Sequence, residues 1–195
     1  MGKSNKDDIS KFHEFDICPT DSTIYLGSCS STSEDDESGV DFQMAERTIK
    51  NLHLLDKKNS AITLKMNNVG GDVYHGLAIY DAIRDCKNKV RIIVYGYVMS
   101  IGSLIFQAAD ERIMSPNARM MIHYGQALIG GHNRDIYKNV EELKKMDKIV
   151  NSIYLERILQ KNPEYNLRRF ENKITFDYYL NAEESIEMGL CDKIL

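Results

Sequence analysis

Residues 90–109 read VRIIVYGYVMSIGSLIFQAA, and this stretch decides the fold. Its first part is rich in β-branched residues and predicts a buried strand over residues 90–97, while the mostly apolar residues 103–109 predict a short buried helix. Ser100 lies at the junction, close to free helical N–H groups that favour developing negative charge. A serine at such a junction either caps the helix or acts as a nucleophile.

Strands and helices alternate on both sides of this junction. Strands are expected at residues 23–26, 61–66 and 119–124, and helices at residues 42–55, 73–85 and 134–161. A further helix begins at the capping sequence of residues 181–184. Such alternation predicts an α/β fold in which a mainly parallel sheet is covered by helices, with functional loops at the C-terminal ends of the strands.

The helix at residues 134–161 is too long for a small domain. At a rise of about 1.5 Å per residue it spans on the order of 40 Å. An apolar seam runs along it among charged residues and consists of Ile136, Val140, Leu143, Met146, Val150, Ile153 and Ile158. We expect part of this helix to project and meet another subunit, with packing wholly on its own core as the alternative.

Length and composition indicate one globular domain over residues 21–195, preceded by a polar arm over residues 1–20. The chain has 195 residues, of which 43% are hydrophobic, so it can bury one substantial core. It carries 25 basic and 29 acidic residues, a net charge of −4, and no basic stripe, which argues against a nucleic-acid partner. The acidic, serine-rich residues 28–39 are interpreted as a solvated surface loop.

The chain shows no sign of a secreted, membrane or metal-binding protein. Its cysteines, Cys18, Cys29, Cys86 and Cys191, lack the C-x-x-C pairing of a zinc site or a disulfide framework. Residues 1–8 lack the apolar core of a signal peptide, and no apolar run is long enough to span a bilayer. We therefore expect a soluble cytoplasmic protein with no membrane partner and no metal.

A serine nucleophile needs a base, an acid that orients the base, and N–H donors for the oxyanion. His123 is the candidate base because it ends an apolar strand, whereas the remaining histidines lie in a polar arm, on helices or in a glycine-rich loop: His13, His53, His75 and His132. Asp177 is the candidate acid, and its aromatic and apolar neighbours predict partial desolvation. A hydrogen-bonded core histidine and a turn or cap carboxylate are the alternatives for these two residues.

The Gly70-Gly71 pair lies between the strand at residues 61–66 and the next helix, so its backbone amides can point into the same region. Asp72-Val73 follows instead of the Gly-Lys-Ser/Thr of a phosphate-binding loop, which disfavours nucleotide binding. The pair is either a tight turn or an oxyanion donor. The order Ser, His, Asp is not that of α/β-hydrolases, chymotrypsin or subtilisin, and Met99 prevents a G-x-S-x-G match.

Over residues 23–195 the chain resembles the ClpP family, the proteolytic subunits of ATP-dependent Clp proteases, as a divergent member for which a phage origin is one option. Four ordered motifs carry the resemblance: residues 67–73 with 76–81, residues 100–102, residues 116–123, and residues 177–190. The resemblance implies a crotonase-like α/β fold in which residues 134–161 form a projecting handle helix. It also makes residues 21–195 a serine peptidase domain.

The resemblance further implies a role for each candidate residue. Ser100 is the nucleophile, His123 the general base and then acid, and Asp177 the orienting carboxylate. The backbone N–H groups of Gly71 and Ile101 bind the oxyanion. A peptide substrate lies as an added strand between two segments that comprise Asp72, Val73, Tyr124, Gly125 and Gln126. The reaction is acylation of Ser100 followed by hydrolysis of the acyl-enzyme.

Members of the family assemble as two stacked heptameric rings that enclose the active sites, with the handle helix in the contact between rings. An AAA+ unfoldase that consumes ATP controls access for unfolded proteins and peptides, and the proteolytic subunit itself needs no cofactor. Phe176 stands where the family has a basic residue that couples ring assembly to activity. The positions of the family's apolar unfoldase-docking pocket fall on side chains too polar to hold an aliphatic anchor, Thr63, Lys65, Asp85 and Ser115.

Two other functions stay open at this point. One is a non-catalytic ClpP-like ring subunit or scaffold. The other is a crotonase-fold acyl-CoA enzyme, which uses oxyanion donors without a Ser-His-Asp set. Viral head-maturation and signal-peptide-type peptidases are further options within the same fold.

Overall fold

The computed structural model describes residues 3–27 and 39–195, with side chains from residue 7 onward. Residues 28–38 of the predicted acidic loop at residues 28–39 therefore lie outside the described residues.

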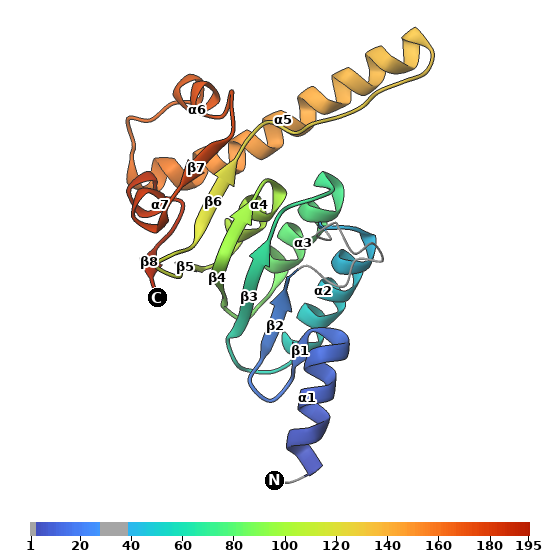
Figure 1. The fold of residues 1–195 in the computed structure, drawn as a ribbon, viewed down its shortest axis with the longest axis vertical. Helices are drawn as coiled ribbons and strands as arrows, with labels where there is room; N and C mark the ends of the chain where they lie inside the picture. The colour runs from blue at the N-terminus through green and yellow to red at the C-terminus, as the bar shows by residue number, and fades with distance from the viewer. Residues whose placement is uncertain (1–2, 28–38) are drawn as a thin grey trace.

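A mainly parallel sheet forms the centre of the molecule, as the alternation of elements predicts (Figure 1). Its parallel strands, in spatial order, are β2 (Thr23–Leu26), β3 (Ile62–Asn68), β4 (Val90–Met99), β5 (Glu111–Met114) and β8 (Lys193–Ile194). Another strand, β6 (Arg119–Ile122), also pairs in parallel with β4. Two short strands pair antiparallel, β1 (Ile17–Cys18) with β2 and β7 (Tyr178–Leu180) with β6.

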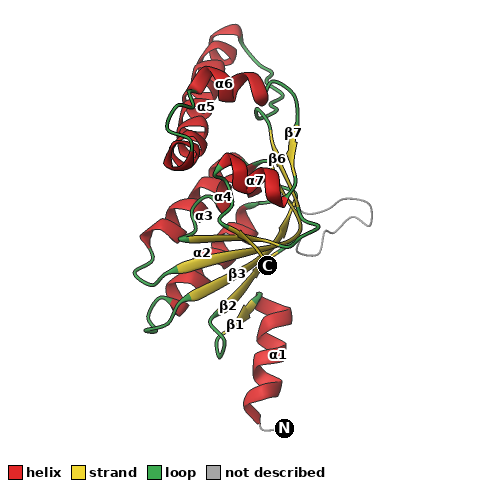
Figure 2. Ribbon diagram, turned by 90° about the vertical axis from the view of Figure 1, so that its left-hand side faces the viewer, coloured by secondary structure: helices red, strands yellow, loops and turns green. Residues whose placement is uncertain are grey.

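Three helices cover one face of this sheet: α2 (Phe42–Leu55), α3 (Val73–Asp85) and α4 (Ile101–Phe106) (Figure 2). They bury apolar side chains against the strands, among them Leu52 of α2, Ile79 of α3 and Leu104 of α4, all fully buried. The later helices are α5 (Asn133–Lys161), α6 (Leu167–Lys173) and α7 (Ala182–Met188). The loops at the strand ends therefore emerge from a sheet that is covered by a layer of helices.

Strand β4 changes its partner halfway along. Residues 91–94 pair with β5, whereas residues 97–99 pair with β6. Gly96 lies between the two pairings with φ of +69°, and a Cβ atom built on it would lie 2.7 Å from Oδ1 of Asn67. Because this conformation and this close approach both favour glycine, the turn away from β5 is encoded at Gly96. The end of β4, and Ser100 after it, thereby comes to lie beside β6.

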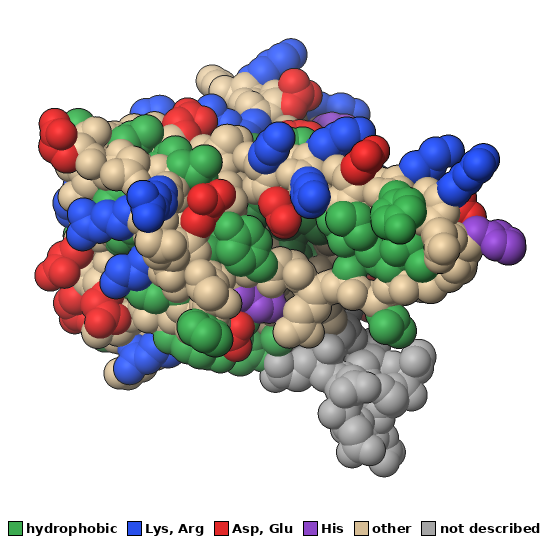
Figure 3. Space-filling view, turned by 90° about the horizontal axis from the view of Figure 1, so that it is seen from above, with side chains coloured by type: hydrophobic (Ala, Val, Ile, Leu, Met, Phe, Trp, Pro, Cys, Tyr) green, Lys and Arg blue, Asp and Glu red, His purple; other side chains and the backbone are tan. Residues whose placement is uncertain are grey.

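Helix α5 projects from the body of the molecule, as predicted (Figure 1). The apolar seam divides in two: Met146 and Ile158 are buried, whereas Val140 is exposed. A view of the molecule from above shows hydrophobic side chains on the exposed surface (Figure 3). Leu128 in the loop before α5 and Tyr137 on its outer part are both exposed. The predicted contact of this helix with another subunit stays a prediction.

Several boundaries and short elements differ from the sequence prediction. The helix predicted at residues 103–109 is α4, which begins at Ile101 and ends at Phe106. The strand predicted at residues 119–124 ends at Ile122, so His123 and Tyr124 follow β6 instead of belonging to it. The polar arm contains a helix that was not predicted, α1 (Lys3–Phe15). Strands β1, β5, β7 and β8 and helix α6 were also missed, because segments this short depend on tertiary pairing more than on their own periodicity.

Within residues 3–27 and 39–195, no helix combines the length and the apolar character needed to cross a bilayer. The same residues contain no cluster of three or more His, Cys, Asp and Glu side chains that could hold a metal ion.

Candidate active site

Ser100 occupies a sharp, strained turn between β4 and α4. Its φ is +50° and its ψ is −130°, a combination that residues other than glycine rarely adopt. Ser100 is the N-cap residue of α4, but its side chain makes no capping hydrogen bond to the start of the helix. The Oγ atom instead lies 2.8 Å from Nε2 of His123. Strained strand-to-helix turns of this kind expose a serine hydroxyl in the α/β-hydrolases.

Strand pairing brings His123 to Ser100. Met99 pairs with Met121, and the backbone N–H of Ser100 continues the ladder by donating to the carbonyl oxygen of Met121 at 2.9 Å. His123 lies two residues beyond Met121, where a side chain points to the same face of the strand. The contact between two residues 23 positions apart in the chain is therefore a consequence of the β4–β6 register.

The antiparallel pairing of β6 with β7 brings Asp177 to His123. Ile122 pairs with Tyr178, and continuing the same register by one residue on each strand places Asp177 opposite His123. Oδ1 of Asp177 lies 3.3 Å from Nδ1 of His123, while Nε2 on the other side of the ring faces Ser100. The three predicted side chains thus form a continuous line in the order Ser100, His123, Asp177.

The two members of the His123–Asp177 pair differ in their access to solvent. The side chain of His123 is 18% exposed, whereas that of Asp177 is 52% exposed. The predicted partial desolvation of Asp177 is therefore wrong for the single chain. Its neighbour Phe176 is 83% exposed and points into solvent instead of covering the carboxylate.

The glycine loop after β3 lies against the same turn. Gly70 has φ of +102°, and a Cβ atom on it would lie 2.6 Å from Cβ of Ser100. Gly71 has φ of +145°, and a Cβ atom on it would lie 2.3 Å from the backbone N of Val40. Since real Cβ atoms do not approach other atoms so closely, glycine is required at both positions.

Two groups of contacts fix the path of this loop. Oδ1 of the fully buried Asn68 accepts a hydrogen bond of 2.9 Å from the backbone N–H of Gly70. Val40 forms a parallel bridge to Gly71, in which the Val40 N–H donates to the Gly70 carbonyl and the Asp72 N–H donates to the Val40 carbonyl. A parallel bridge of this kind leaves the N–H of Gly71 itself on the opposite side.

The two predicted oxyanion donors make no hydrogen bond within the described part of the chain. Among the described residues, the N–H groups of Gly71 and Ile101 have no acceptor in the protein. Ile101 is the first residue of α4, so its N–H has no partner within the helix. Neither N–H group is therefore engaged by the part of the chain that the structure describes, and the oxyanion role stays a prediction.

The predicted substrate-strand residues on the two sides of the site differ in how far the protein itself engages them. Asp72 is engaged by the protein itself, because its carboxylate caps α3 by accepting from Tyr74 N–H at 2.9 Å and His75 N–H at 3.0 Å. Val73 is the first residue of α3. On the other side, Tyr124, Gly125 and Gln126 follow β6 without regular secondary structure, and Tyr124 and Gln126 line a hollow of about 500 Å³ beside His123 and Asp177.

The other candidate groups lie elsewhere. The remaining histidines are on α1 (His13), α2 (His53) and α3 (His75) and at the start of α5 (His132). Three of the cysteines, Cys18, Cys86 and Cys191, carry free thiols. Burial raises the pKa of the Cys86 thiol to about 11, which keeps it protonated at neutral pH. Cys29 lies outside the described residues.

The sequence reasoning missed three residues that hold the site in place. Asn68 fixes Gly70, while Ser103 and Tyr154 contact the backbone of Ser100. Asn68 and Ser103 are polar residues at buried positions of β3 and α4, which is the signal in the sequence that could have identified them. Tyr154 is a buried residue of the charge-rich helix α5, and the sequence carries no comparable signal for it.

Comparisons with known proteins give one family. The family model described as Clp protease matches residues 37–195. The chain is 34% identical over 160 residues to the ATP-dependent Clp protease proteolytic subunit of Deinococcus radiodurans, covering 80% of this chain and 76% of that protein. It is 36% identical over 162 residues to the ATP-dependent Clp protease proteolytic subunit 2 of Pseudomonas aeruginosa, covering 80% and 77%.

A solved structure shares the fold. A mutant of ClpP1 from Listeria monocytogenes superposes on this chain with a TM-score of 0.75 and 24% identity, covering 95% of this chain and 94% of that one. The similarity extends over nearly the whole chain and includes the mainly parallel sheet and its covering helices.

Proposed function

The chain belongs to the Clp protease family, and on this basis we propose that it is a serine endopeptidase with Ser100 as the nucleophile. The observation that carries the proposal is the contact of 2.8 Å between Oγ of Ser100 and Nε2 of His123. Asp177 supports it from the far side of the ring, 3.3 Å from Nδ1.

The proposed mechanism follows from this line of contacts. Neutral His123 takes the hydroxyl proton of Ser100 while Oγ attacks the carbonyl carbon of the scissile peptide bond. The carboxylate of Asp177 stabilises the imidazolium that forms. The protonated His123 then donates its proton to the leaving amine as the peptide C–N bond breaks. A water molecule, deprotonated by His123, then attacks the acyl carbon. His123 returns that proton to Oγ as the ester C–O bond breaks, which releases the carboxylic acid product and restores the Ser100 hydroxyl.

The free N–H groups stabilise the oxyanion of both tetrahedral intermediates. Gly71 offers one N–H from the glycine loop, and Ile101 offers the other from the start of α4. Preorganised backbone donors of this kind typically contribute about 10²–10³-fold each to the rate of acyl transfer. The strained backbone of Ser100 fits this role, because it brings Oγ and the next N–H toward one point.

We assign the peptide substrate to the space between residues 71–73 and 124–126, where it would add a strand. Gly71 and Val73 border the space on one side, and Tyr124, Gly125 and Gln126 border it on the other. Asp72 contributes indirectly in this assignment, because its backbone N–H and carboxylate are both engaged within the chain.

We also propose that the subunits form stacked heptameric rings and that α5 lies between the rings. The exposed apolar residues of its outer half, Tyr137 and Val140, support this, since a free monomer rarely exposes such a seam. An AAA+ unfoldase would be the ATP-consuming partner. Thr63, in the docking region, is buried and accepts a hydrogen bond from Arg91, so a partner would have to dock by other contacts than an apolar pocket.

Labelling by a fluorophosphonate tests the proposed nucleophile. The probe should attach to Ser100 in the purified full-length chain, as located by peptide mass spectrometry, and Ser100→Ala should abolish the labelling. Ser152→Ala is the matched control, because Ser152 is an exposed serine on α5 whose hydroxyl contacts only the backbone of its own helix. Native mass spectrometry of the same sample measures ring assembly. Assembled rings that neither label nor cleave peptides would point to the non-catalytic subunit, and turnover of a CoA thioester that survives Ser100→Ala would point to the acyl-CoA enzyme.

A further inference from the structure

The carbonyl group of Ser100 is held by a hydrogen-bond chain that leads to the handle helix. The Ser100 carbonyl oxygen accepts two hydrogen bonds from Ser103, one from its backbone N–H at 3.0 Å and one from its hydroxyl at 2.7 Å. The hydroxyl of Tyr154, on α5, lies 2.6 Å from Oγ of Ser103 and 3.4 Å from the same carbonyl oxygen. Since the single hydroxyl proton of Ser103 is given to the carbonyl, Tyr154 acts as the donor to Ser103.

The hydrogen-bond chain from Tyr154 to the Ser100 carbonyl is buried away from solvent. Ser103 is fully buried and Tyr154 is almost fully buried. Burial raises the pKa of Tyr154 well above its usual value, so its hydroxyl remains a donor at all ordinary pH values. Hydrogen bonds that are shielded from water are stronger and hold a narrower geometry than exposed ones.

The direction of the Ser100 carbonyl decides the direction of an oxyanion donor. The carbonyl of Ser100 and the N–H of Ile101 belong to the same planar peptide unit, in which they point in opposite directions. Fixing the carbonyl through Ser103 and Tyr154 therefore fixes the Ile101 N–H. This restraint acts on a residue whose φ of +50° is strained and would otherwise relax.

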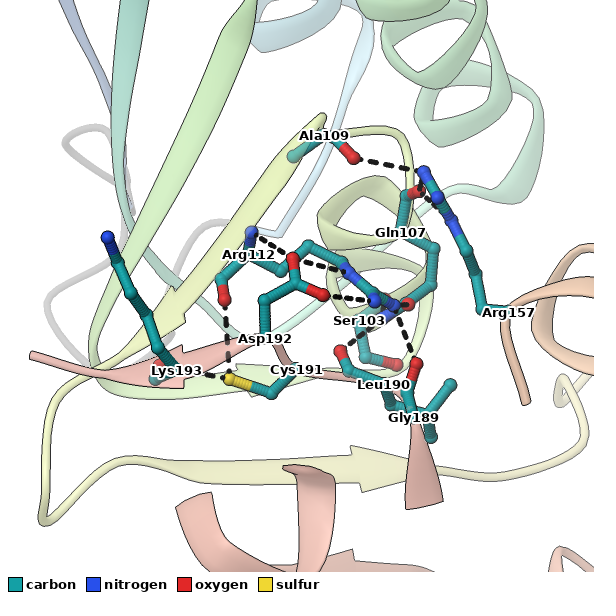
Figure 4. Close-up of polar contacts among 10 residues, drawn as sticks. All are labelled: Ser103, Gln107, Ala109, Arg112, Arg157, Gly189, Leu190, Cys191, Asp192 and Lys193. Atoms are coloured by element: carbon teal, nitrogen blue, oxygen red, sulfur yellow. Dashed lines mark hydrogen bonds and ion pairs between the residues drawn. The ribbon is translucent and has the colours of Figure 1, made fainter. Parts of the chain in front are cut away.

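The same helix also holds the other end of α4. Arg157, three residues after Tyr154, donates to the Gln107 carbonyl at 2.9 Å and 2.6 Å and to the Ala109 carbonyl at 2.9 Å (Figure 4). Gln107 is the C-terminal cap of α4, and its side chain donates to the Ser103 carbonyl. Helix α5 thus contacts α4 at its start through Tyr154 and at its end through Arg157.

We propose that Ser103 and Tyr154 are positioning residues that aim the Ile101 N–H at the oxyanion and so couple the handle helix to acylation of Ser100. The inference rests on the proposed peptidase function. A displacement of α5 along α4 moves the Tyr154 hydroxyl away from Ser103 and leaves the peptide unit held from within α4 alone, by the N–H and hydroxyl of Ser103.

Two hydroxyl deletions test this coupling, Ser103→Ala and Tyr154→Phe. Each should lower kcat for a fluorogenic peptide, and the rate of fluorophosphonate labelling, by about tenfold, since one preorganised donor is worth about 10²–10³-fold when it is lost outright. KM should stay unchanged, because neither residue belongs to the segments at 71–73 and 124–126. The double variant should be no slower than Ser103→Ala alone, because both hydroxyls act on the same carbonyl.

Matched controls separate positioning from loss of a buried hydroxyl in general. Ser185→Ala, on α7, removes another fully buried hydroxyl, which donates at 2.7 Å to the backbone carbonyl of the N-cap residue Asn181. Tyr165→Phe removes a buried tyrosine hydroxyl that has no partner among the described residues. Both controls should retain the wild-type kcat and labelling rate.

Native mass and thermal unfolding of every variant complete the experiment. Labelling of Ser103→Ala and Tyr154→Phe at the wild-type rate would overturn the inference. A rise in KM at constant kcat, or a loss of activity that follows loss of ring assembly in proportion, would also overturn it, because a merely structural role gives those results. If Tyr154→Phe fails to fold, Ser103→Ala decides alone. A wild-type chain that does not label refutes the proposed function, and this inference with it.

Discussion

Replacing Gly70 by alanine tests the close approach of the glycine loop to Ser100. A Cβ atom at position 70 would lie 2.6 Å from Cβ of Ser100 and 2.8 Å from the Met99 carbonyl oxygen. Two carbon atoms in contact need about 3.5 Å or more. The loop and the serine must therefore separate by about 1 Å, and a misplacement of about 1 Å in an active site costs on the order of 10²-fold in rate.

The substitution also has a separate cost in stability. Gly70 has φ of +102°, a conformation that alanine adopts only with strain of about 1–3 kcal/mol. For a chain of this size each kcal/mol lowers the Tm by roughly 2–4 °C. We therefore expect Gly70→Ala to remain folded at room temperature with kcat for peptide cleavage reduced by about 10²-fold.

The control and the assay are both defined by the structure. Gly130→Ala is matched to the test variant, because a Cβ atom there meets no atom within 4 Å. Peptide cleavage and fluorophosphonate labelling are measured for both variants beside the wild type, with Tm from thermal unfolding. Wild-type kcat in a folded Gly70→Ala protein would refute the argument that this loop and Ser100 are held in direct contact.

Three further changes have defined outcomes. Asp177→Asn should lower kcat for peptide cleavage. The loss should be smaller than the roughly 10⁴-fold that is typical of a buried triad acid, because the Asp177 side chain is 52% exposed. An unchanged kcat would contradict the role of Asp177. Asn68→Ala leaves the Gly70 N–H without its acceptor and should lower the free energy of unfolding, measured with denaturant, by about 1–3 kcal/mol. It should also lower kcat. An unchanged kcat would show that the glycine loop keeps its position without Asn68. Burial alone would raise the pKa of Asp192, but hydrogen bonds from Arg112 hold this pKa below its usual value of 3.8. The Arg112–Asp192 pair therefore stabilises the fold above pH 3.8, and this stability is lost as the pH falls through the lowered pKa. Asp192→Asn should be less stable than the wild type at pH 7 by chemical denaturation, with a difference that shrinks in acid; a difference independent of pH would show that the charge is not involved.

Much of the site could be predicted because its chemistry-bearing residues lie at the ends of recognisable elements. Ser100 stands between an apolar strand and an apolar helix, and Gly70 and Gly71 stand between a strand and a helix. Strand ends of a parallel sheet gather at one edge, so the sequence alone predicts that these residues lie in one region.

The parts that the sequence did not predict depend on pairing between distant segments. The sequence predicted a strand over residues 119–124, but its end at Ile122 and its pairing with β7 follow from the contact with residues 178–180. The desolvation predicted for Asp177 was wrong because a list of apolar neighbours does not show where they point, and Phe176 points outward. Local composition reports what a residue is next to in the chain, and burial is a property of the fold.

The register of three strand pairs is what makes one site of these residues. Pairing of β3 with β4 sets the glycine loop beside Ser100, pairing of β4 with β6 sets His123 beside it, and pairing of β6 with β7 adds Asp177. A slip of one residue in any of these pairs would turn the side chain concerned to the opposite face. The sharp turn at Ser100 cannot be maintained by the register alone, because its backbone is strained. A second restraint is therefore needed at the Ser100 carbonyl, where the backbone N–H of Ser103 donates at 3.0 Å and the side chains of Ser103 and Tyr154 add their hydroxyls.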